Sequence, residues 1–335
     1  MAQVALKKEL KLSSIAKFRE LGLSGFIILL AVLVQLRNPS FLTLENINDM
    51  IRNTAILSIL AVGMMLVIVT RGIDLSIGST LALSGMISAL AISANPSLHP
   101  LLTILIGMLI GTVCGGITGL LVSKVNILPI IATLGMMNVY RGLTYMVSKG
   151  KWVSAYQMSD GFKGIATGSI LKINTLVFIA IIIYIIFYYF INYTRTGRQI
   201  YAVGSNPESA EISGISVDKI LLMVYTIMGT LAGLAGVLWV SKFASAQGDT
   251  AMGYEMTVIA ACVLGGVNIA GGSGKISGII MGSLLLGILN NALPLINVSP
   301  FWQQAIQGFI ILFAVIVNAV VKRSVDRNNL MRRKI

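Results

Sequence analysis

The chain has 335 residues, of which 56% are hydrophobic and 11% charged, and its mean hydropathy is +0.88. These values leave too few polar residues to cover a soluble globule, so they predict an integral membrane protein. The net charge of +13 does not indicate nucleic-acid binding, because the basic residues stand at the ends of apolar runs and in the two tails, without interleaved aromatic residues.

The first 21 residues are polar and basic, and an apolar run at 22–36 follows them. A secretory signal peptide is the alternative interpretation. However, the leader is long, and no small-x-small cleavage site precedes Arg37 and Pro39. We therefore expect 1–21 to be a cytoplasmic segment and the run to be an uncleaved first span.

Nine further apolar runs follow, at 54–70, 76–94, 101–123, 127–147, 174–193, 220–241, 254–268, 275–293 and 301–321. Most are close to the roughly 20 residues that cross a bilayer as a helix, while the first, second and eighth runs are short enough to be tilted or partly re-entrant. The sequence thus predicts an all-α polytopic protein of about ten transmembrane helices. Its single transmembrane domain would cover 22–321, surrounded by lipid, with a basic cytoplasmic tail at 322–335.

The distribution of basic residues favours a topology with both termini in the cytoplasm. In this arrangement 194–219 is cytoplasmic, and the long loop at 148–173 is outside, as is Arg141 at a helix end. The inner side then holds the basic tail together with Arg71, Lys124, Arg195, Arg198, Lys219 and Lys275.

Two glycine patterns indicate how the helices pack. Small residues recur every fourth position at Gly107, Gly111, Gly115 and Gly119, and again at Gly274, Gly278 and Gly282. Small residues at this spacing let helix backbones approach closely inside a membrane. We assign these glycines a structural role.

An internal similarity appears when 72–79 (GIDLSIGS) is laid over 266–273 (GVNIAGGS), at a constant offset of 194. Six predicted helices separate the two segments, so both should face the same side of the membrane. The first contains Asp74. A charge near the bilayer is costly and often functional, but Asp74 is equally interpreted as a cap for the following helix.

The longest polar interruption in the second half of the chain, 194–220, predicts a short helix at 207–213. Asn206 suits the N-cap, Pro207 the first turn and Glu208 the positive end of the helix, and Gly214 suits a left-handed stop. So short a helix is marginal alone in water and should pack against something. It is either a capped turn on its own protein or a docking helix for a partner.

Polar side chains inside the apolar helices, together with Asp74, are candidates to line a translocation path. Hydrogen bonds between helices are the alternative role for each of them. The candidates are Asn138, Asn290, Asn291, Gln303, Gln304 and Gln307.

No catalytic, metal or cofactor motif accompanies these residues. The stretch 271–278 lacks the glycine and the Ser or Thr that a phosphate loop requires, Cys114 and Cys262 are isolated, and His99 stands alone. The sequence therefore predicts a protein that is not itself an enzyme.

Four stretches, at 72–85, 131–142, 194–220 and 260–293, resemble the permease subunits of ribose-type sugar importers of the ATP-binding cassette (ABC) class. The resemblance implies a bacterial plasma-membrane permease for a monosaccharide, paired with a second permease copy or paralogue. It also implies an extracytoplasmic sugar-binding protein and a cytoplasmic ATPase that holds ATP and Mg. The loop 194–220 would be the coupling loop, with functional positions at Arg195, Gly197, Gly204, Asn206, Pro207, Glu208, Ala210, Ser213, Gly214 and Ile215.

The resemblance implies that the short helix moves as a rigid handle when the ATPases close, so that the attached spans tilt and open the path to either side in turn. Parts of the chain also resemble permeases for rhamnose or autoinducer-2. From another class, an ion-coupled secondary transporter would place its coupling acids inside the membrane, whereas only Asp74 and Glu255 lie near span starts.

Overall fold

The computed structural model describes residues 22, 24–299, 301–303, 305, 306, 308, 309, 312 and 316. Within these residues the regular secondary structure is helical, apart from a hairpin of two short antiparallel strands, β1 (Ser169–Ile170) and β2 (Ile173–Asn174), and an isolated bridge between Val153 and Ala246. The predicted segments 1–21 and 322–335 lie outside the described residues.

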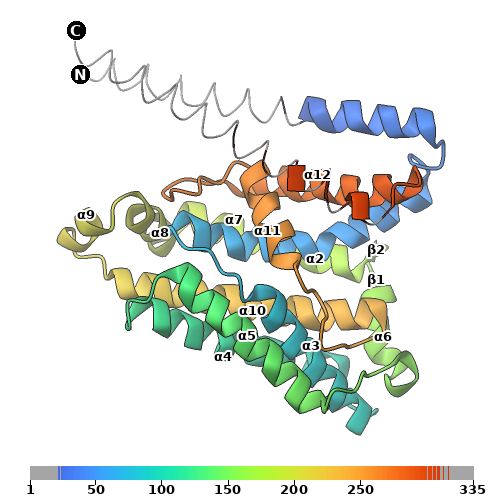
Figure 1. The fold of residues 1–335 in the computed structure, drawn as a ribbon, viewed down its shortest axis with the longest axis horizontal. Helices are drawn as coiled ribbons and strands as arrows, with labels where there is room; N and C mark the ends of the chain where they lie inside the picture. The colour runs from blue at the N-terminus through green and yellow to red at the C-terminus, as the bar shows by residue number, and fades with distance from the viewer. Residues whose placement is uncertain are drawn as a thin grey trace.

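The helices follow the predicted apolar runs in order (Figure 1). The long ones are Ser24–Arg37, α2 (Leu44–Val69), α3 (Ile77–Ala94), α4 (Pro100–Ser123), α5 (Pro129–Ser148), α7 (Thr175–Tyr193), α10 (Val217–Phe243), α11 (Tyr254–Leu264) and α12 (Ile276–Leu295). The shorter elements are η1 (Ala155–Gln157), α6 (Asp160–Thr167), α8 (Arg195–Ser205) and α9 (Pro207–Ile212).

Six of these helices, α2, α3, α4, α7, α10 and α12, are long and apolar enough to cross a membrane. The protein is therefore an all-helical, multi-pass membrane protein, as predicted. The total of ten crossings and the cytoplasmic position of both termini remain predictions, because α5, α11 and Ser24–Arg37 are not among the six, and most of 301–321 is not described.

Helix α2 begins ten residues before the apolar run that predicted it. The hydroxyl of Thr43 accepts a hydrogen bond from the backbone N–H of Asn46 at 3.4 Å and so caps a polar first stretch that the hydropathy pattern did not include. The second predicted span is thus a helix of 26 residues, and the expectation that it is short was wrong.

Helix α10 lies at the centre of the bundle and packs against α4 through bare backbone (Figure 1). A Cβ added at Gly111 would lie 2.7 Å from the backbone of Gly233, and one at Gly229 would lie 2.6 Å from the backbone of Gly115. On α12, a Cβ at Gly282 would lie 2.7 Å from the backbone N of Gly265. The first glycine pattern, together with Gly278 and Gly282 of the second, therefore marks close backbone contacts as predicted, whereas Gly274 lies in the loop before α12.

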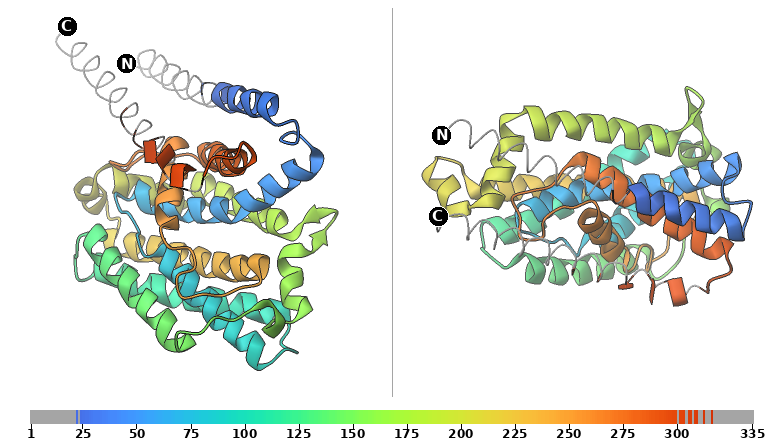
Figure 2. Two further views of the ribbon diagram at one scale, coloured as in Figure 1. Left: turned by 45° about the vertical axis from the view of Figure 1, so that its right-hand side comes forward. Right: turned by 90° about the horizontal axis from the view of Figure 1, so that it is seen from above.

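The bundle has two ends (Figure 2). The α9 end carries α8, α9, the loop 265–275 and the beginning of the loop 70–76, which then runs into the middle of the bundle (Figure 1). The hairpin end carries the β1–β2 hairpin, α6 and the loop that precedes α6. Helix α10, which is long and apolar enough to cross a membrane, runs from the first end to the second.

Candidate coupling and translocation site

Helix α9 has the local structure that its sequence predicts. The Oδ1 atom of Asn206 accepts a hydrogen bond from the backbone N–H of Ser209 at 2.9 Å, and Pro207 occupies the first turn. Gly214 has a φ of +80°, and the N–H of Ile215 returns to the carbonyl of Ala210 at 3.0 Å. The helix is thus closed at both ends by its own sequence.

The two faces of α9 have different surroundings. Ala210 is only 4% exposed and packs into the main hydrophobic core, so it anchors the helix to its own chain. Ile212 is 89% exposed, and the side chains of Glu208, Glu211 and Ser213 beside it are exposed as well. An isoleucine exposed to this degree leaves apolar surface available to a partner.

Helix α8, which precedes α9, was not predicted. Its first residue, Arg195, is exposed. Gly197 is buried, and a Cβ at this position would lie 2.5 Å from the carbonyl oxygen of Phe190 at the end of α7. The chain therefore turns from α7 into α8 at a point where only glycine fits.

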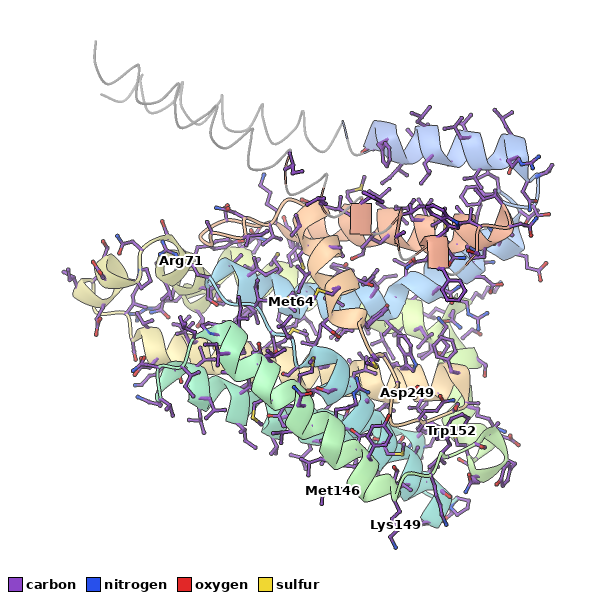
Figure 3. The ribbon with its side chains drawn as sticks, viewed as in Figure 1. Met64, Arg71, Met146, Lys149, Trp152 and Asp249 are labelled. Atoms are coloured by element: carbon purple, nitrogen blue, oxygen red, sulfur yellow. The ribbon has the colours of Figure 1, made fainter. Side chains whose placement is uncertain are left out.

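A junction at the α9 end joins α8 to the loop after α2. Arg71, labelled in Figure 3, donates from Nε to the carbonyl of Gly204 at 2.7 Å and from Nη2 to the carbonyl of Ser205 at 2.5 Å. These carbonyls lie at the C-terminus of α8, where backbone oxygens lack helical partners and the helix dipole favours a cation. The guanidinium thus caps α8 directly before α9.

The loop 265–275 completes the same junction. The N–H of Gly272 donates to the carbonyl of Val69, the last residue of α2, at 2.9 Å. The hydroxyl of Tyr201 on α8 donates to the carbonyl of Gly274 at 2.7 Å. A Cβ at Gly204 would lie 2.8 Å from the backbone of both Val69 and Gly272. We call these contacts among Val69, Arg71, Gly204, Ser205 and Gly272 the Arg71 junction.

The loop 265–275, which contains the similar segment 266–273, therefore meets the end of α2 at Val69 and Arg71, directly before the other similar segment 72–79. That the two segments face the same side of the membrane stays a prediction. Sequence analysis identified Arg71 only as part of the charge bias, because its partners are more than 130 positions away. The signal that could have identified it is its place directly before the first of the two similar segments.

Asp74 lies in the loop 70–76, outside the six candidate spans, and its side chain is 2% exposed. Its Oδ1 atom accepts hydrogen bonds from the backbone N–H of Ser76 at 2.8 Å and from the Ser76 hydroxyl at 2.6 Å. Burial raises the pKa of Asp74 to about 6, although both bonds from Ser76 oppose this shift. These bonds hold the turn directly before α3, but α3 has no side-chain cap hydrogen bond, so Asp74 does not cap the helix, and its role in the path stays a prediction.

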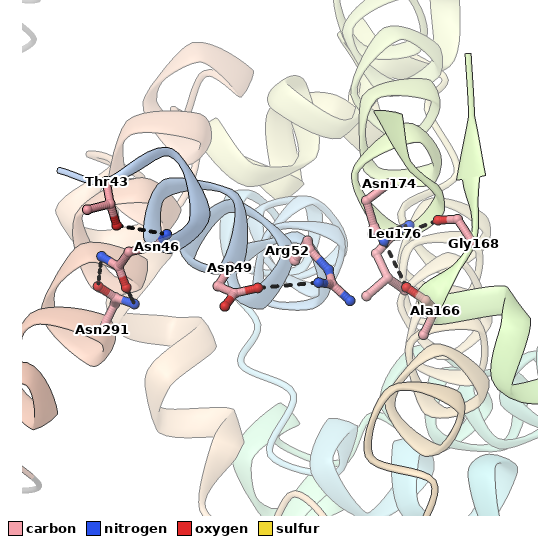
Figure 4. A network of polar contacts seen from close by, with 9 residues as sticks. All are labelled: Thr43, Asn46, Asp49, Arg52, Ala166, Gly168, Asn174, Leu176 and Asn291. Atoms are coloured by element: carbon pink, nitrogen blue, oxygen red, sulfur yellow. Dashed lines mark hydrogen bonds and ion pairs between the residues drawn. The ribbon is translucent and has the colours of Figure 1, made fainter. Parts of the chain in front are cut away.

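The other path candidates are spread over α5, α12 and the segment that follows α12. Asn291 exchanges two hydrogen bonds of 2.9 Å with Asn46 of α2 (Figure 4), which is the helix-to-helix role. Asn138 donates to the carbonyl of Leu134 on its own helix at 3.0 Å, and Gln303 donates to the carbonyl of Val298 at 2.8 Å. Asn290 is exposed on α12. Gln304 and Gln307 lie outside the described residues.

At the hairpin end, polar contacts join the start of α2 and the start of α7 to their surroundings (Figure 4). Arg52 pairs with Asp49 at 3.3 Å, and the side-chain amide of Asn174 donates to the carbonyls of Ala166 and Gly168 at 2.9 and 3.2 Å. A cavity of about 410 Å³ between them is lined in part by Arg52 and Lys172. In the part of the chain that the structure describes, no cluster of His, Cys, Asp or Glu is suited to hold a metal ion.

Comparison with known proteins agrees with this architecture. The family model described as branched-chain amino acid transport system / permease component matches residues 46–315. The ribose import permease protein RbsC of Escherichia coli K12 is 39% identical over 89% of this chain and 92% of its own length. RbsC of Bacillus subtilis is 40% identical over 87% of this chain and 89% of its own length.

The L-arabinose transport system permease protein AraH of Escherichia coli K12 is 35% identical over 83% of this chain and 84% of its own length. No solved structure matches. The family match covers well over half of the chain, and the relatives align along most of their own lengths. The chain therefore belongs to this family of transport-system permease components, and it is a multi-pass protein of the inner membrane.

Proposed function

We propose that the protein is the membrane permease of an ABC importer that moves a pentose, ribose or a similar sugar, into the cell. The observation that carries this proposal is the 39–40% identity to ribose import permeases along nearly the whole chain. Ribose and arabinose, which appear in the names of the relatives, are both uncharged polyhydroxylated pentoses. ATP would be hydrolysed by a separate cytoplasmic subunit.

The outer face of α9 would be the contact with that ATPase. Ile212 offers an exposed apolar side chain next to the exposed acids Glu208 and Glu211, while Ala210 keeps the helix attached to the permease. In this proposal the α9 end faces the cytoplasm, together with both termini. The hairpin end faces outward and receives the sugar-binding protein near the cavity lined by Arg52 and Lys172.

The Arg71 junction would carry the movement of α9 into the membrane. A push on α9 reaches the C-terminus of α2 through Arg71 and the start of α12 through the loop 265–275. Two permease copies, or one copy and a paralogue, would then open the path between them to one side at a time. ATP inside and the loaded binding protein outside must each favour one of these states to drive the cycle.

Transport by a reconstituted complex tests the proposal. The permease, its ATPase and its binding protein are placed in proteoliposomes and assayed with ribose, arabinose, rhamnose and autoinducer-2. We expect ATP-dependent uptake of a pentose. Uptake restricted to rhamnose or autoinducer-2 would contradict the proposal that the substrate is a pentose. Uptake driven by an ion gradient without ATP would contradict the ABC mechanism.

A further inference from the structure

The segment 244–253, which connects α10 to α11, is not helical although it enters the bundle. It begins at the hairpin end, where Ala246 and Val153 exchange two backbone hydrogen bonds of 3.0 Å. It ends beside the start of α3, because a Cβ added at Gly78 would lie 2.6 Å from the carbonyl oxygen of Ala251 and 2.8 Å from Oε2 of Glu255.

The contact at Gly78 shows how deeply the segment enters. Gly78 is the second residue of α3, a candidate span, and at 1.5 Å per residue it lies about 24 Å from the other end of that helix at Ala94. Helix α11 has only 11 residues, about 16 Å, and continues from here toward the α9 end. The segment and α11 together form one broken crossing with a non-helical half and a helical half. That the eighth span is tilted or partly re-entrant stays a prediction.

Arg141 of α5 holds the non-helical half in place. Its Nη1 atom donates to the carbonyls of Gly248 and Thr250, at 2.7 and 2.8 Å. The ring of Tyr145 packs so closely on Gly248 that a Cβ there would lie 2.5 Å from Cδ1 of the tyrosine. Arg141 lies within α5, seven positions before its end, so its predicted place at a helix end was wrong. Instead, it satisfies carbonyls that have no helical partner.

The opposite side of the segment is open. The side chain of Asp249 is exposed, and Met252 is 79% exposed. Figure 3 labels Asp249 on this segment. A carboxylate exposed to lipid at this depth is costly, and irregular backbone inside a membrane occurs where it is buried in protein or lines a water-filled cavity. The open side therefore does not face lipid, and it is covered by water or by another protein chain in the membrane.

We propose that residues 247–252 form a sugar-contacting wall of the translocation path, in which the carboxylate of Asp249 accepts hydrogen bonds from sugar hydroxyls and Arg141 is the positioning residue. The proposal rests on the proposed function. Half-broken spans mark substrate sites in other transporter folds. A carboxylate forms strong hydrogen bonds to hydroxyl groups and suits an uncharged polyol better than an anionic substrate.

Transport of deoxy sugars by the reconstituted complex tests the contact. We expect Asp249→Asn to reduce ribose uptake about tenfold, the equivalent of one charged hydrogen bond, without loss of ATPase binding. The wild-type complex should take up the deoxyribose that lacks the contacted hydroxyl more slowly than ribose. The Asp249→Asn complex, which has already lost the contact, should take up these two sugars at similar rates. Asp249→Glu should restore part of the uptake. Asp160→Asn, which alters an exposed acid at the hairpin end, is the control and should change nothing.

If Asp249→Asn discriminates between ribose and every deoxyribose as the wild type does, the contact is absent and the proposal is overturned. Accessibility gives a second measurement. Because Cys114 and Cys262 are buried, Asp249→Cys provides a single reactive thiol. We expect a membrane-impermeant thiol reagent to modify it and stop uptake, and the sugar-loaded binding protein to alter the rate of modification.

No modification from either side of the membrane would overturn the assignment of Asp249 to the path. The two failures are distinguishable. If the wild-type complex imports a pentose but Asp249→Cys does not react, only the path assignment fails. If the wild-type complex imports no sugar, the proposed function fails, and the reactivity of Asp249→Cys still reports whether the segment faces water.

Discussion

If α9 couples to the ATPase as proposed, Arg71 is the residue on which communication between α9 and the membrane helices would depend most directly. Its two hydrogen bonds cross between elements far apart in sequence, and each satisfies a carbonyl at a helix end. We predict that Arg71→Ala costs about 1–3 kcal/mol of local stability, since hydrogen bonds to charged groups are worth about this much and the guanidinium is partly exposed. ATPase should still co-purify, but sugar-stimulated ATP hydrolysis and uptake should fall severalfold.

The matched control for this prediction is Lys219→Ala, which removes an exposed positive charge from the same end of the molecule. Arg71→Lys should recover part of the coupling, because a lysine can donate to one carbonyl but not bridge both with a planar fork. Full coupling in Arg71→Ala, measured as the ratio of sugar transported to ATP hydrolysed, would show that α9 communicates by another route.

Substitutions at Ile212 and Ala210 distinguish the role of α9 in binding the ATPase from its role in the folding of the permease. We predict that Ile212→Asp leaves the melting temperature of the purified permease unchanged, because the side chain contacts solvent, yet abolishes co-purification of the ATPase. Ala210→Asp should lower the melting temperature, because it places an unpaired charge in the core. Leu171→Asp, also at a highly exposed apolar residue but at the hairpin end, is the control. Normal ATPase binding by Ile212→Asp would identify α9 as a surface turn.

At the scale of elements, α4 offers a test of close packing. We predict that Gly111→Leu prevents correct assembly, because the added side chain would occupy space filled by the backbone of α10. Gly116→Leu on the same helix is the control, since its Cβ would approach only Thr226 Oγ1, at 3.9 Å. The measurement is the yield of monodisperse complex after size-exclusion chromatography. Equal yields for the two variants would contradict the packing interpretation.

The elements also show what a sequence can and cannot reveal. The bounds of α9 were predicted to within one residue, because Asn206, Pro207 and Gly214 act on their immediate neighbours. Helix α8 was missed because its amphipathic pattern is short and interrupted by glycines. The path candidates were chosen as polar residues in apolar helices. Arg141 and Asp249 were not among them, because Asp249 lies in the non-helical segment 244–253 and Arg141 is distinguished only by its contacts with that segment. Its course depends on tertiary contacts that no local pattern encodes.

At the scale of the whole molecule, the orientation in the membrane is open to a direct test. We predict that Pro207→Cys reacts with an impermeant thiol reagent only from the cytoplasmic side and that Lys151→Cys reacts only from outside, as the distribution of basic residues implies. The buried native cysteines should give little background. Reaction of Pro207→Cys with the reagent outside intact cells would show that the predicted topology is wrong and that α9 is not on the side where the ATPase binds.

The contact between α4 and α10 should make local opening of these two helices slow. Where glycine faces glycine, the two helices leave no side-chain layer for water to enter, and their backbones can separate only together. We expect the amides of 107–119 and 225–237 to exchange with deuterium more slowly than any others, during turnover as well as at rest. The amides of 244–253 should exchange fastest within the bundle. Such a contrast, measured by mass spectrometry, would divide the permease into a part that persists through each transport cycle and a part that rearranges in it.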